Sequence, residues 1–377
     1  MTDAPEARSW QPGDEPGSRR FVRLTTPDDA GLRLESGVTL PDATVAYETR
    51  GTLNESRSNA VLVLHALTGD SHAAGPAGPG HPEPGWWDPL IGPGRAVDTD
   101  RWFVVCPNVL GGCQGTTGPS SAAPDGAPWG SRFPRLTIRD QVTAETFLAD
   151  HLGIDRWAGV VGGSMGGMRV LEWCIGHPDR VGRAAVLAVG ASATAEQIAL
   201  CSIQCRTIRL DPDFGGGDYY GTDRTPTVGM GLAREIGQIS YRTEAELDRR
   251  FGRRPQGEED PLSGGRFAVE SYLGHQGAKL VRRFDPNSYV VLSEAMNSHD
   301  VGRGRGGVAA ALDRVTARVQ VAGIDSDRLY PLALQEELAR LLPGHGTYTK
   351  IESEFGHDGF LLEVDQAGAV VASALGA

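Results

Sequence analysis

The sequence predicts an α/β fold: a mostly parallel sheet with helices on both faces and a helical lid inserted between two of its strands. Three observations support this prediction. Continuous apolar segments recur along the chain, segments with helical periodicity lie between them, and one long stretch in the second half breaks the alternation. Alternating buried strands and helices are typical of a parallel sheet covered on both sides.

The chain of 377 residues begins with residues 1–18, which are rich in Pro, Gly and acidic side chains. This composition predicts a flexible N-terminal arm. Short β-rich segments follow at 21–24 and 38–49, and a Leu-Pro-Asp turn interrupts the second. We expect antiparallel strands here.

Five continuous apolar segments predict strands that are buried on both faces. They are AVLVLHA at 60–66, RWFVVCPNV at 101–109, WAGVVGG at 157–163, RAAVLAVG at 183–190 and RVQVAGI at 318–324. Helical patterns lie between them at 138–153 and 165–178, where His-Pro ends the second helix. A helix from Pro331, a strand around 346–353 and a helix at 363–375 complete the predicted sheet domain.

Residues 192–310 lack the buried-strand pattern. They contain three helical segments, separated by Gly-, Pro- and Arg-rich breaks, at 194–208, 226–241 and 268–284. Because this stretch lies between two predicted strands of one sheet, we interpret it as a helical lid domain. The core domain is then formed by 19–191 and 311–377.

Composition excludes several classes of function. A net charge of -12 and the absence of a dense basic run exclude the phosphate-binding surface of a nucleic-acid-binding protein. Of 36 basic residues only Lys279 and Lys350 are lysines, and neither lies in a P-loop or in a setting that suggests a Schiff base.

The five cysteines have neither zinc-site nor disulfide-framework spacing, so we expect no metal and a cytoplasmic location. The N-terminal segment lacks the features of a signal peptide, and no apolar run is long enough to span a membrane. We therefore expect a protein that is neither exported by that route nor inserted in a membrane.

The sharpest local signal is Gly162-Gly163-Ser164-Met165-Gly166-Gly167, which contains G-x-S-x-G. In a chain with 51 glycines this pattern alone is weak. Here a predicted strand runs directly into it and a predicted helix follows, which is the context of the nucleophile elbow in α/β hydrolases. The sequence therefore predicts an α/β-hydrolase fold with Ser164 as the nucleophile.

A serine nucleophile needs a base and an acid, which follow it in the chain in the order Ser, Asp or Glu, His in this fold. His357 follows the last predicted strand and is the candidate base. The acid is Asp325 or Asp327, because both follow the strand at 318–324 and spacing alone does not choose between them. We expect the other histidines to be packed or at the surface: His65, which ends a strand, and His72, His81, His151, His177, His275, His299 and His345.

The oxyanion hole of this fold consists of two backbone N–H groups. One belongs to the residue after the nucleophile, here Met165. The other comes from the loop at 65–70, where Leu67 is the best candidate.

Several longer strings resemble the homoserine O-acetyltransferases of methionine biosynthesis. The resemblance extends from Phe21 to the C-terminus, and these strings have no structural reason to recur in α/β hydrolases in general. They are HALTGDSH (65–72), GWWDPLIGPGRAVDTDRWFVV (85–105), NVLGGCQGTTGPSS (108–121), FPRLTIRDQV (133–142), GGSMGGM (162–168), IDSDRLYP (324–331) and GHDGFLLE (356–363).

The resemblance implies an acid at Asp327 rather than Asp325, and it agrees with Ser164 and His357 as nucleophile and base. Arg234 and Tyr241 in the lid string GLAREIGQISY, together with Asp358, match positions that line the acceptor site of the family. Arg234 would hold the carboxylate of homoserine and Asp358 its ammonium group. Arg169 departs from the family, which more often has Gln there.

The family further implies a homodimer formed through the lid helices and a tunnel for the acyl-CoA thioester. The small-molecule partners are then L-homoserine and acetyl-CoA, with no permanently bound cofactor. The expected mechanism is double displacement: His357 activates Ser164, the acyl group passes to Ser164, and homoserine then accepts it. Three alternatives remain: another acceptor or donor such as serine, deacetylcephalosporin or succinyl-CoA, a plain esterase, and a binding protein on a hydrolase scaffold.

Overall fold

A computed structural model describes residues 10–24, 30–342, 344 and 346–376. Its centre is an eight-stranded sheet in the order β1-β4-β8-β5-β9-β10-β11-β12. β1 and β4 pair antiparallel with their neighbours, and the pairs from β8 to β12 are parallel. The mostly parallel sheet and the α/β-hydrolase fold predicted from the sequence are confirmed.

The sheet strands are β1 (Arg20–Arg23), β4 (Thr44–Arg50), β5 (Ala60–Leu64), β8 (Phe103–Pro107), β9 (Gly159–Gly163), β10 (Arg183–Leu187), β11 (Arg318–Ile324) and β12 (Gly346–Ile351). Short two-residue strands form two further pairs, β2 (Leu32–Arg33) with β3 (Thr39–Leu40) and β6 (Ile91–Gly92) with β7 (Val97–Asp98).

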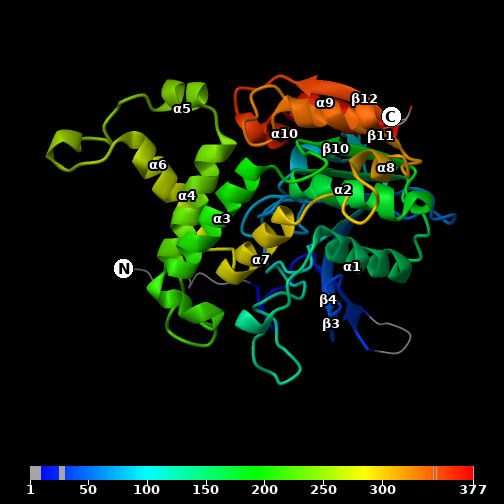
Figure 1. Cartoon of the computed structure of the whole chain (residues 1–377), viewed down its shortest axis with the longest axis horizontal. Helices are drawn as coiled ribbons and strands as arrows, with labels where there is room; N and C mark the ends of the chain where they lie inside the picture. Colours follow the sequence, from blue (N-terminus) through cyan, green and yellow to red (C-terminus); the bar gives the residue numbers. More distant parts are fainter. Residues whose placement is uncertain (1–9, 25–29, 343, 345, 377) are drawn as a thin grey trace.

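Both faces of the central strands are buried, as their continuous apolar sequences predict. Along β5, Leu62 and Leu64 belong to the apolar cluster on one face of the sheet, whereas Val61 and Val63 belong to the cluster on the other. The first cluster includes side chains of α1 and α2, and the second includes α11. Helices therefore cover the sheet on both sides (Figure 1).

The helices of the core domain are α1 (Ile138–His151), α2 (Met165–Gly176), α9 (Leu332–Leu341), α10 (Gly359–Leu362) and α11 (Val364–Leu375). The Thr137 side chain caps α1 by accepting a hydrogen bond from the backbone N–H of Asp140, and Asp140 reciprocates. Such a capping box fixes where the helix begins.

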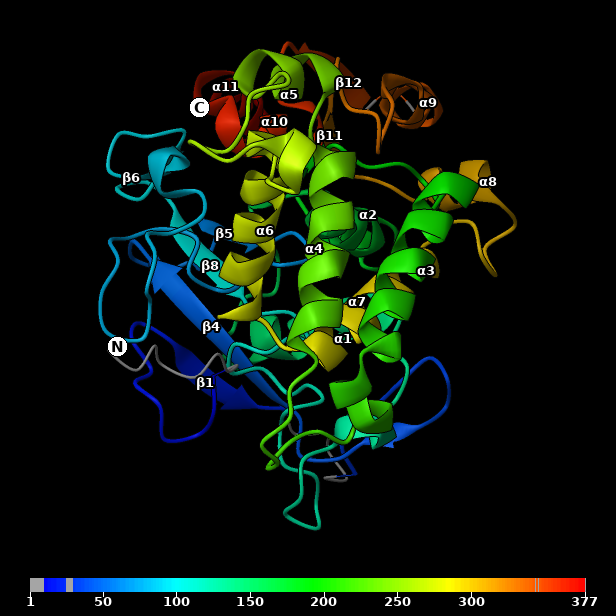
Figure 2. The ribbon, with the colours of Figure 1, turned by 90° about the vertical axis from the view of Figure 1, so that its left-hand side faces the viewer.

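Six helices lie between β10 and β11 in the chain: α3 (Ala195–Leu210), α4 (Thr227–Tyr241), α5 (Glu244–Arg250), α6 (Ala268–Val281), α7 (Pro286–Asn297) and α8 (Val308–Leu312). α3, α4 and α6 stand side by side at one side of the sheet domain (Figure 1) and face the viewer in Figure 2. The predicted helices correspond to these three. α5, α7 and α8 were not predicted.

The expected flexible arm, residues 1–18, falls partly outside the described residues. Its described part lies against the body of the protein: Trp10 stacks on Phe21 and the backbone N–H of Ser18 lies 3.1 Å from His81 Nε2. Among the described residues, no helix has the length and apolar character needed to cross a membrane.

Candidate active site

Ser164 lies at a tight turn between β9 and α2. Its backbone has φ 55° and ψ -126°, a strained conformation for a residue with a side chain, and its N–H donates to Leu187 O at 3.0 Å. A Cβ on Gly166 would lie 2.0 Å from Leu64 O, so only glycine allows α2 to approach β5 this closely. The sequence pattern therefore produces the strand-turn-helix elbow that exposes the serine hydroxyl.

Ser164, His357 and Asp327 form one hydrogen-bonded chain. His357 Nε2 lies 2.9 Å from Ser164 Oγ, and His357 Nδ1 lies 2.7 Å from Asp327 Oδ2. All three side chains are buried, with at most 5% of each exposed. The structure thus brings together the three residues that the sequence singled out.

Of the two candidate acids, Asp327 is the one that contacts His357. Its second oxygen, Oδ1, accepts hydrogen bonds from the backbone N–H groups of Leu329 and Tyr330 at 2.8 and 2.9 Å. Asp325 Oδ1 instead accepts the N–H of Ser353 at 3.0 Å. The turn after β11 therefore fixes one carboxylate against the histidine and uses the other to join two loops.

The imidazole of His357 is held among aromatic rings. It stacks on Tyr330 with 5.0 Å between ring centroids and meets Phe360 edge-on at 5.6 Å. Burial lowers the pKa of His357, but the charge and hydrogen bond of Asp327, with the charge of Asp358, outweigh it and raise the pKa above its ordinary value. The imidazole is a stronger base than a free histidine and can accept the proton of a neighbouring hydroxyl.

The two expected oxyanion donors lie beside Ser164. Met165 is the first residue of α2, where backbone N–H groups have no partner within the helix. Leu67 lies in the loop after β5 and lines the same cavity as Ser164. The two expected donors therefore come from two different elements, α2 and the loop after β5.

The cavity at Ser164 has a volume of about 110 Å³ and is lined both by core residues and by residues of the helices between β10 and β11. The three expected acceptor-site residues all line it: Arg234 and Tyr241 from α4, and Asp358 next to His357. The Arg234 guanidinium lies over the Tyr241 ring, 5.5 Å from its centroid. Apart from His357, Arg234 and Asp358 are the charged side chains among the described lining residues.

Sequence reasoning missed three residues of this site. Arg242 Nη1 pairs with Asp358 Oδ2 at 3.3 Å, so the carboxylate has a cation nearby before any substrate binds. Tyr330 covers one face of His357, and Gln197 of α3 lines the cavity while its amide donates to Leu329 O at 2.6 Å. Arg242 follows Tyr241 directly in the chain, which was the one available signal.

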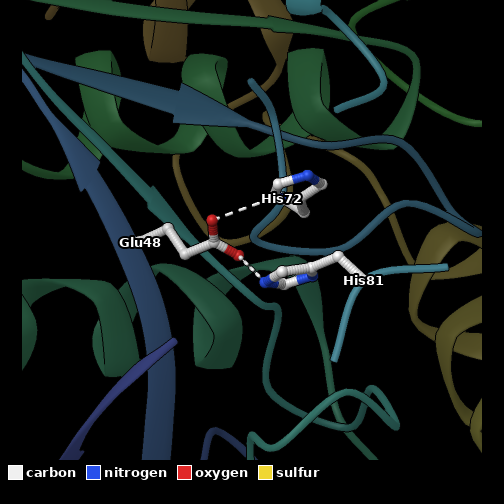
Figure 3. Close-up of side chains that lie close together, drawn as sticks. All are labelled: Glu48, His72 and His81. Carbon is white, nitrogen blue, oxygen red and sulfur yellow. Dashed lines mark hydrogen bonds and ion pairs between the residues drawn. The ribbon is translucent and has the colours of Figure 1, made fainter. Parts of the chain in front are cut away.

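Among the described residues, Glu48, His72 and His81 are the group whose side chains could together hold a metal ion (Figure 3). Glu48 Oε2 lies 3.0 Å from His72 Nδ1, and Glu48 Oε1 lies 3.3 Å from His81 Nε2. The two imidazoles stack nearly parallel, with centroids 3.9 Å apart and 9° between planes. An ion binds in the plane of each imidazole, and two stacked planes share no such position, so the arrangement suits hydrogen bonding rather than metal binding.

The other histidines lie where packing predicts, as far as they are described. His65 is buried at the end of β5, and His299 is buried with its Nε2 3.0 Å from Gly190 O. Burial lowers the pKa of His81 to about 4. His345 lies outside the described residues.

Together these groups can perform nucleophilic acyl transfer. A buried serine hydroxyl touches an imidazole with a raised pKa, a carboxylate orients that imidazole, and backbone donors flank the serine. The opposite charges on Arg234 and Asp358 add a binding site for a small molecule that carries both a carboxylate and an amine.

Comparisons with known proteins agree with this chemistry. The sequence model described as alpha/beta hydrolase fold matches residues 59–364. The chain is 62% identical to the homoserine O-acetyltransferase of Thermobifida fusca over 370 residues, covering 97% of this chain and 96% of that protein.

Two solved structures share the architecture. The homoserine O-acetyltransferase of Bacillus anthracis superposes with a TM-score of 0.87 at 28% identity, covering 95% of this chain and 97% of that one. Esterase E22 superposes with a TM-score of 0.85 at 26% identity, covering 95% and 99%. The same fold therefore occurs in a protein named as an acetyltransferase and in one named as an esterase.

Proposed function

Because the chain belongs to the homoserine O-acetyltransferase family, its function is to transfer an acetyl group to the hydroxyl of L-homoserine, and we propose that Ser164 carries that group from acetyl-CoA. The observation that carries this proposal is the 2.9 Å contact between Ser164 Oγ and His357 Nε2, in a cavity that also contains Arg234 and Asp358. The product is O-acetyl-L-homoserine, an intermediate for methionine.

In the first half-reaction His357 Nε2 takes the proton of Ser164 Oγ, and the oxygen attacks the thioester carbonyl of acetyl-CoA. The N–H groups of Met165 and Leu67 stabilise the oxyanion that forms. When it collapses, the carbon–sulfur bond breaks and the proton passes from His357 to the sulfur. Free CoA leaves, and an acetyl ester remains on Ser164.

In the second half-reaction homoserine enters the emptied cavity. His357 takes the proton of its side-chain hydroxyl, and that oxygen attacks the acetyl ester. The bond to Ser164 breaks, the serine oxygen recovers the proton from His357, and the new ester leaves. Asp327 keeps the Nδ1 proton of His357 in place through both halves, because its carboxylate accepts that proton's hydrogen bond.

The acceptor is oriented by two charges. Arg234 is a suitable partner for the carboxylate of homoserine, and Asp358 for its ammonium group. Tyr241 lies against both Arg234 and His357, with 5.9 Å between its ring and that of His357. Homoserine anchored by the two charged groups on its α-carbon would direct its side-chain hydroxyl toward Ser164.

The same charges favour acetyl-CoA over succinyl-CoA as donor. A succinyl group carries an extra carboxylate that needs a cation where it is buried. Arg234 is the cationic side chain among the described lining residues, and the nearby Arg242 is paired with Asp358 and Glu246. If Arg234 holds homoserine, the described lining residues offer a succinyl carboxylate no second cation.

Hydrolysis is the competing reaction, and the similarity to esterase E22 is the observation that favours it. A hydrolase and a transferase of this design differ in whether water or the acceptor reaches the acyl serine first. The lid residues that line the cavity include the apolar side chains of Leu200, Cys201 and Met296, which would limit access of water to the acyl serine.

Lid helices also provide the surface for the expected homodimer. Exposed apolar side chains lie on both α3 and α4, with exposed fractions from 40% to 74%: Ile198, Ile203, Leu210, Val228, Leu232 and Ile239. Ser164, His357, Asp327 and backbone donors supply each step, so the reaction requires no permanently bound cofactor. The five cysteines are free, which agrees with the expected cytoplasmic location.

The test is a comparison of acyl-CoA consumption with homoserine and with serine, using acetyl-CoA and succinyl-CoA in turn. We expect rapid turnover with acetyl-CoA and homoserine, and no acetylated protein by mass spectrometry for Ser164→Ala. Ser298→Ala, a serine whose hydroxyl donates to Ala295 O, is the matched control and should acylate normally. Normal turnover of Ser164→Ala would contradict the mechanism, and release of acetate at the same rate with and without homoserine would indicate an esterase.

A further inference from the structure

A fully buried arginine connects the nucleophile helix to the oxyanion loop. Arg169 lies on α2, five residues after Ser164, with no exposed surface. Its Nη2 donates to the backbone carbonyl of His65, and its Nη1 donates to Glu145 Oε1 at 2.7 Å. The arginine therefore fixes the first peptide group after β5 to the helix that begins at the serine.

His65 extends this connection by one peptide. Its Nε2 accepts a hydrogen bond from the backbone N–H of Val109 at 3.0 Å, which requires that nitrogen to be unprotonated. The proton of the neutral ring is then on Nδ1, which donates to Ala66 O at 2.8 Å. Ala66 O also accepts the N–H of Gly69 at 2.9 Å.

The carbonyl that His65 holds belongs to the same peptide as the Leu67 N–H. This peptide is trans, so its C=O and N–H point in opposite directions. When His65 and Gly69 bind the carbonyl oxygen, the direction of the Leu67 N–H is fixed on the other side. Leu67 lines the cavity that contains Ser164.

We propose that Arg169 and His65 are positioning residues that aim the Leu67 N–H at the oxyanion. This inference rests on the proposed acylation of Ser164. Helix α2 then positions both oxyanion donors. It positions the Met165 N–H directly, at its first residue, and the Leu67 N–H through Arg169 and the two peptides that follow His65.

The charges around Arg169 fit this role. Glu145 balances the arginine, and its second oxygen accepts the indole N–H of Trp173 at 2.7 Å. Burial, together with the charge of Arg169, lowers the pKa of His65 to about 3. His65 therefore stays neutral, and a protonated ring, which could not accept from Val109, does not form near neutral pH.

The test compares two double variants that differ in one donor. Arg169→Met with Glu145→Gln removes the donor to His65 O, whereas Arg169→Gln with Glu145→Gln keeps an amide donor at that position. Glu145 is changed in both, because removing one partner of a buried ion pair is strongly destabilising. Glutamine at 145 still accepts from Trp173.

The readout is the burst of p-nitrophenolate as p-nitrophenyl acetate acylates the enzyme, which requires no homoserine. Loss of an oxyanion donor costs about 10²–10³ in rate, so we expect a misaimed donor in the Met variant to slow the burst about 10–100-fold. The Gln variant should recover most of the rate at an equal melting temperature. Arg305→Met with Glu172→Gln is the control: it removes a 2.6 Å ion pair to the same helix, away from the loop, and should leave the burst unchanged.

Equal burst rates in the Met and Gln variants would overturn the proposal. If neither double variant folds, nitrogen NMR of the native protein decides it, because His65 must carry its proton on Nδ1 across the neutral pH range. A proton on Nε2 would contradict the proposal. Ser164→Ala distinguishes a failure of this proposal from a failure of the proposed function. A burst that persists in that variant contradicts the proposed function itself.

Discussion

The two walls of the cavity at Ser164 are built differently. On the core side hydrogen bonds hold each functional group: two backbone N–H groups hold Asp327, Asp327 holds His357, and Arg169 and His65 hold the oxyanion loop. The Tyr330 ring also stacks on His357. On the lid side the Arg234 guanidinium lies over the Tyr241 ring and lines the cavity. This difference fits our proposal that the core performs the chemistry and the lid selects the acceptor.

The largest effect should follow from breaking the core side at Asp327. In Asp327→Asn the amide no longer fixes the Nδ1 proton of His357, and we expect kcat to fall about 10⁴-fold with the fold retained. Steady-state acetyl transfer measures this change. Asp325→Asn, two residues away, is the matched control and should remain close to fully active. A comparable loss in both variants would show that the loop, and not the contact with His357, is responsible.

Breaking the lid side should affect binding instead. In Arg234→Ala the acceptor carboxylate loses a charged hydrogen bond of about 1.5–3 kcal/mol, so KM for homoserine should rise roughly 10–100-fold. KM for acetyl-CoA and the burst with p-nitrophenyl acetate should change little. Arg206→Ala, an exposed arginine on α3, is the control. An unchanged KM for homoserine would remove Arg234 from the acceptor site.

The pH dependence of acylation is a further test of the core side. His357 must be neutral to accept a proton, so the acylation rate should fall about tenfold per pH unit below the pKa of His357. The midpoint of this acidic limb should lie above the ordinary histidine pKa of about 6.5. Asp358 contributes to raising that pKa, and Asp358→Asn should therefore shift the limb to lower pH. The measurement is the burst rate against pH. A shift to higher pH would contradict the assigned charge effect.

The smallest effect on catalysis should come from the outer surface of the lid. Val228→Asp with Leu232→Asp places charges in the apolar surface of α4 and should convert a dimer to monomers in sedimentation. Leu362→Asp is the control, because Leu362 has the same 46% exposure as Leu232 but lies on α10. A wild-type protein that sediments as a monomer would contradict the proposed dimer interface on the lid.

Much of the core side could be predicted from the sequence. The strands are continuous apolar segments, and Ser164, Asp327 and His357 follow them in the chain order of the fold. Spacing could not separate Asp327 from Asp325, because the choice depends on which carboxylate the N–H groups of Leu329 and Tyr330 bind. That is a property of the folded turn.

Other features left no pattern in the sequence. α7 is buried on most of its surface, so it lacks the one-sided apolar periodicity that reveals α3 or α4. Glu48 lies on β4, and His72 and His81 lie in the loop after β5, so only the fold brings the carboxylate to the two rings. Arg169 was visible as a departure from the family, but its contact with His65 depends on the close approach of α2 to β5.

The position of the lid has a consequence for the order in which the protein folds. β9, α2 and β10 are neighbours in the chain, so the turn that presents Ser164 can form from local contacts. β11 pairs with β10 only after the whole lid segment between Leu187 and Arg318 has closed into a loop, and such long-range closures are slow. Asp327 and His357 follow β11 and β12. We therefore expect the nucleophile to be in place before its base, so that a nascent chain exposes the serine turn but cannot activate it.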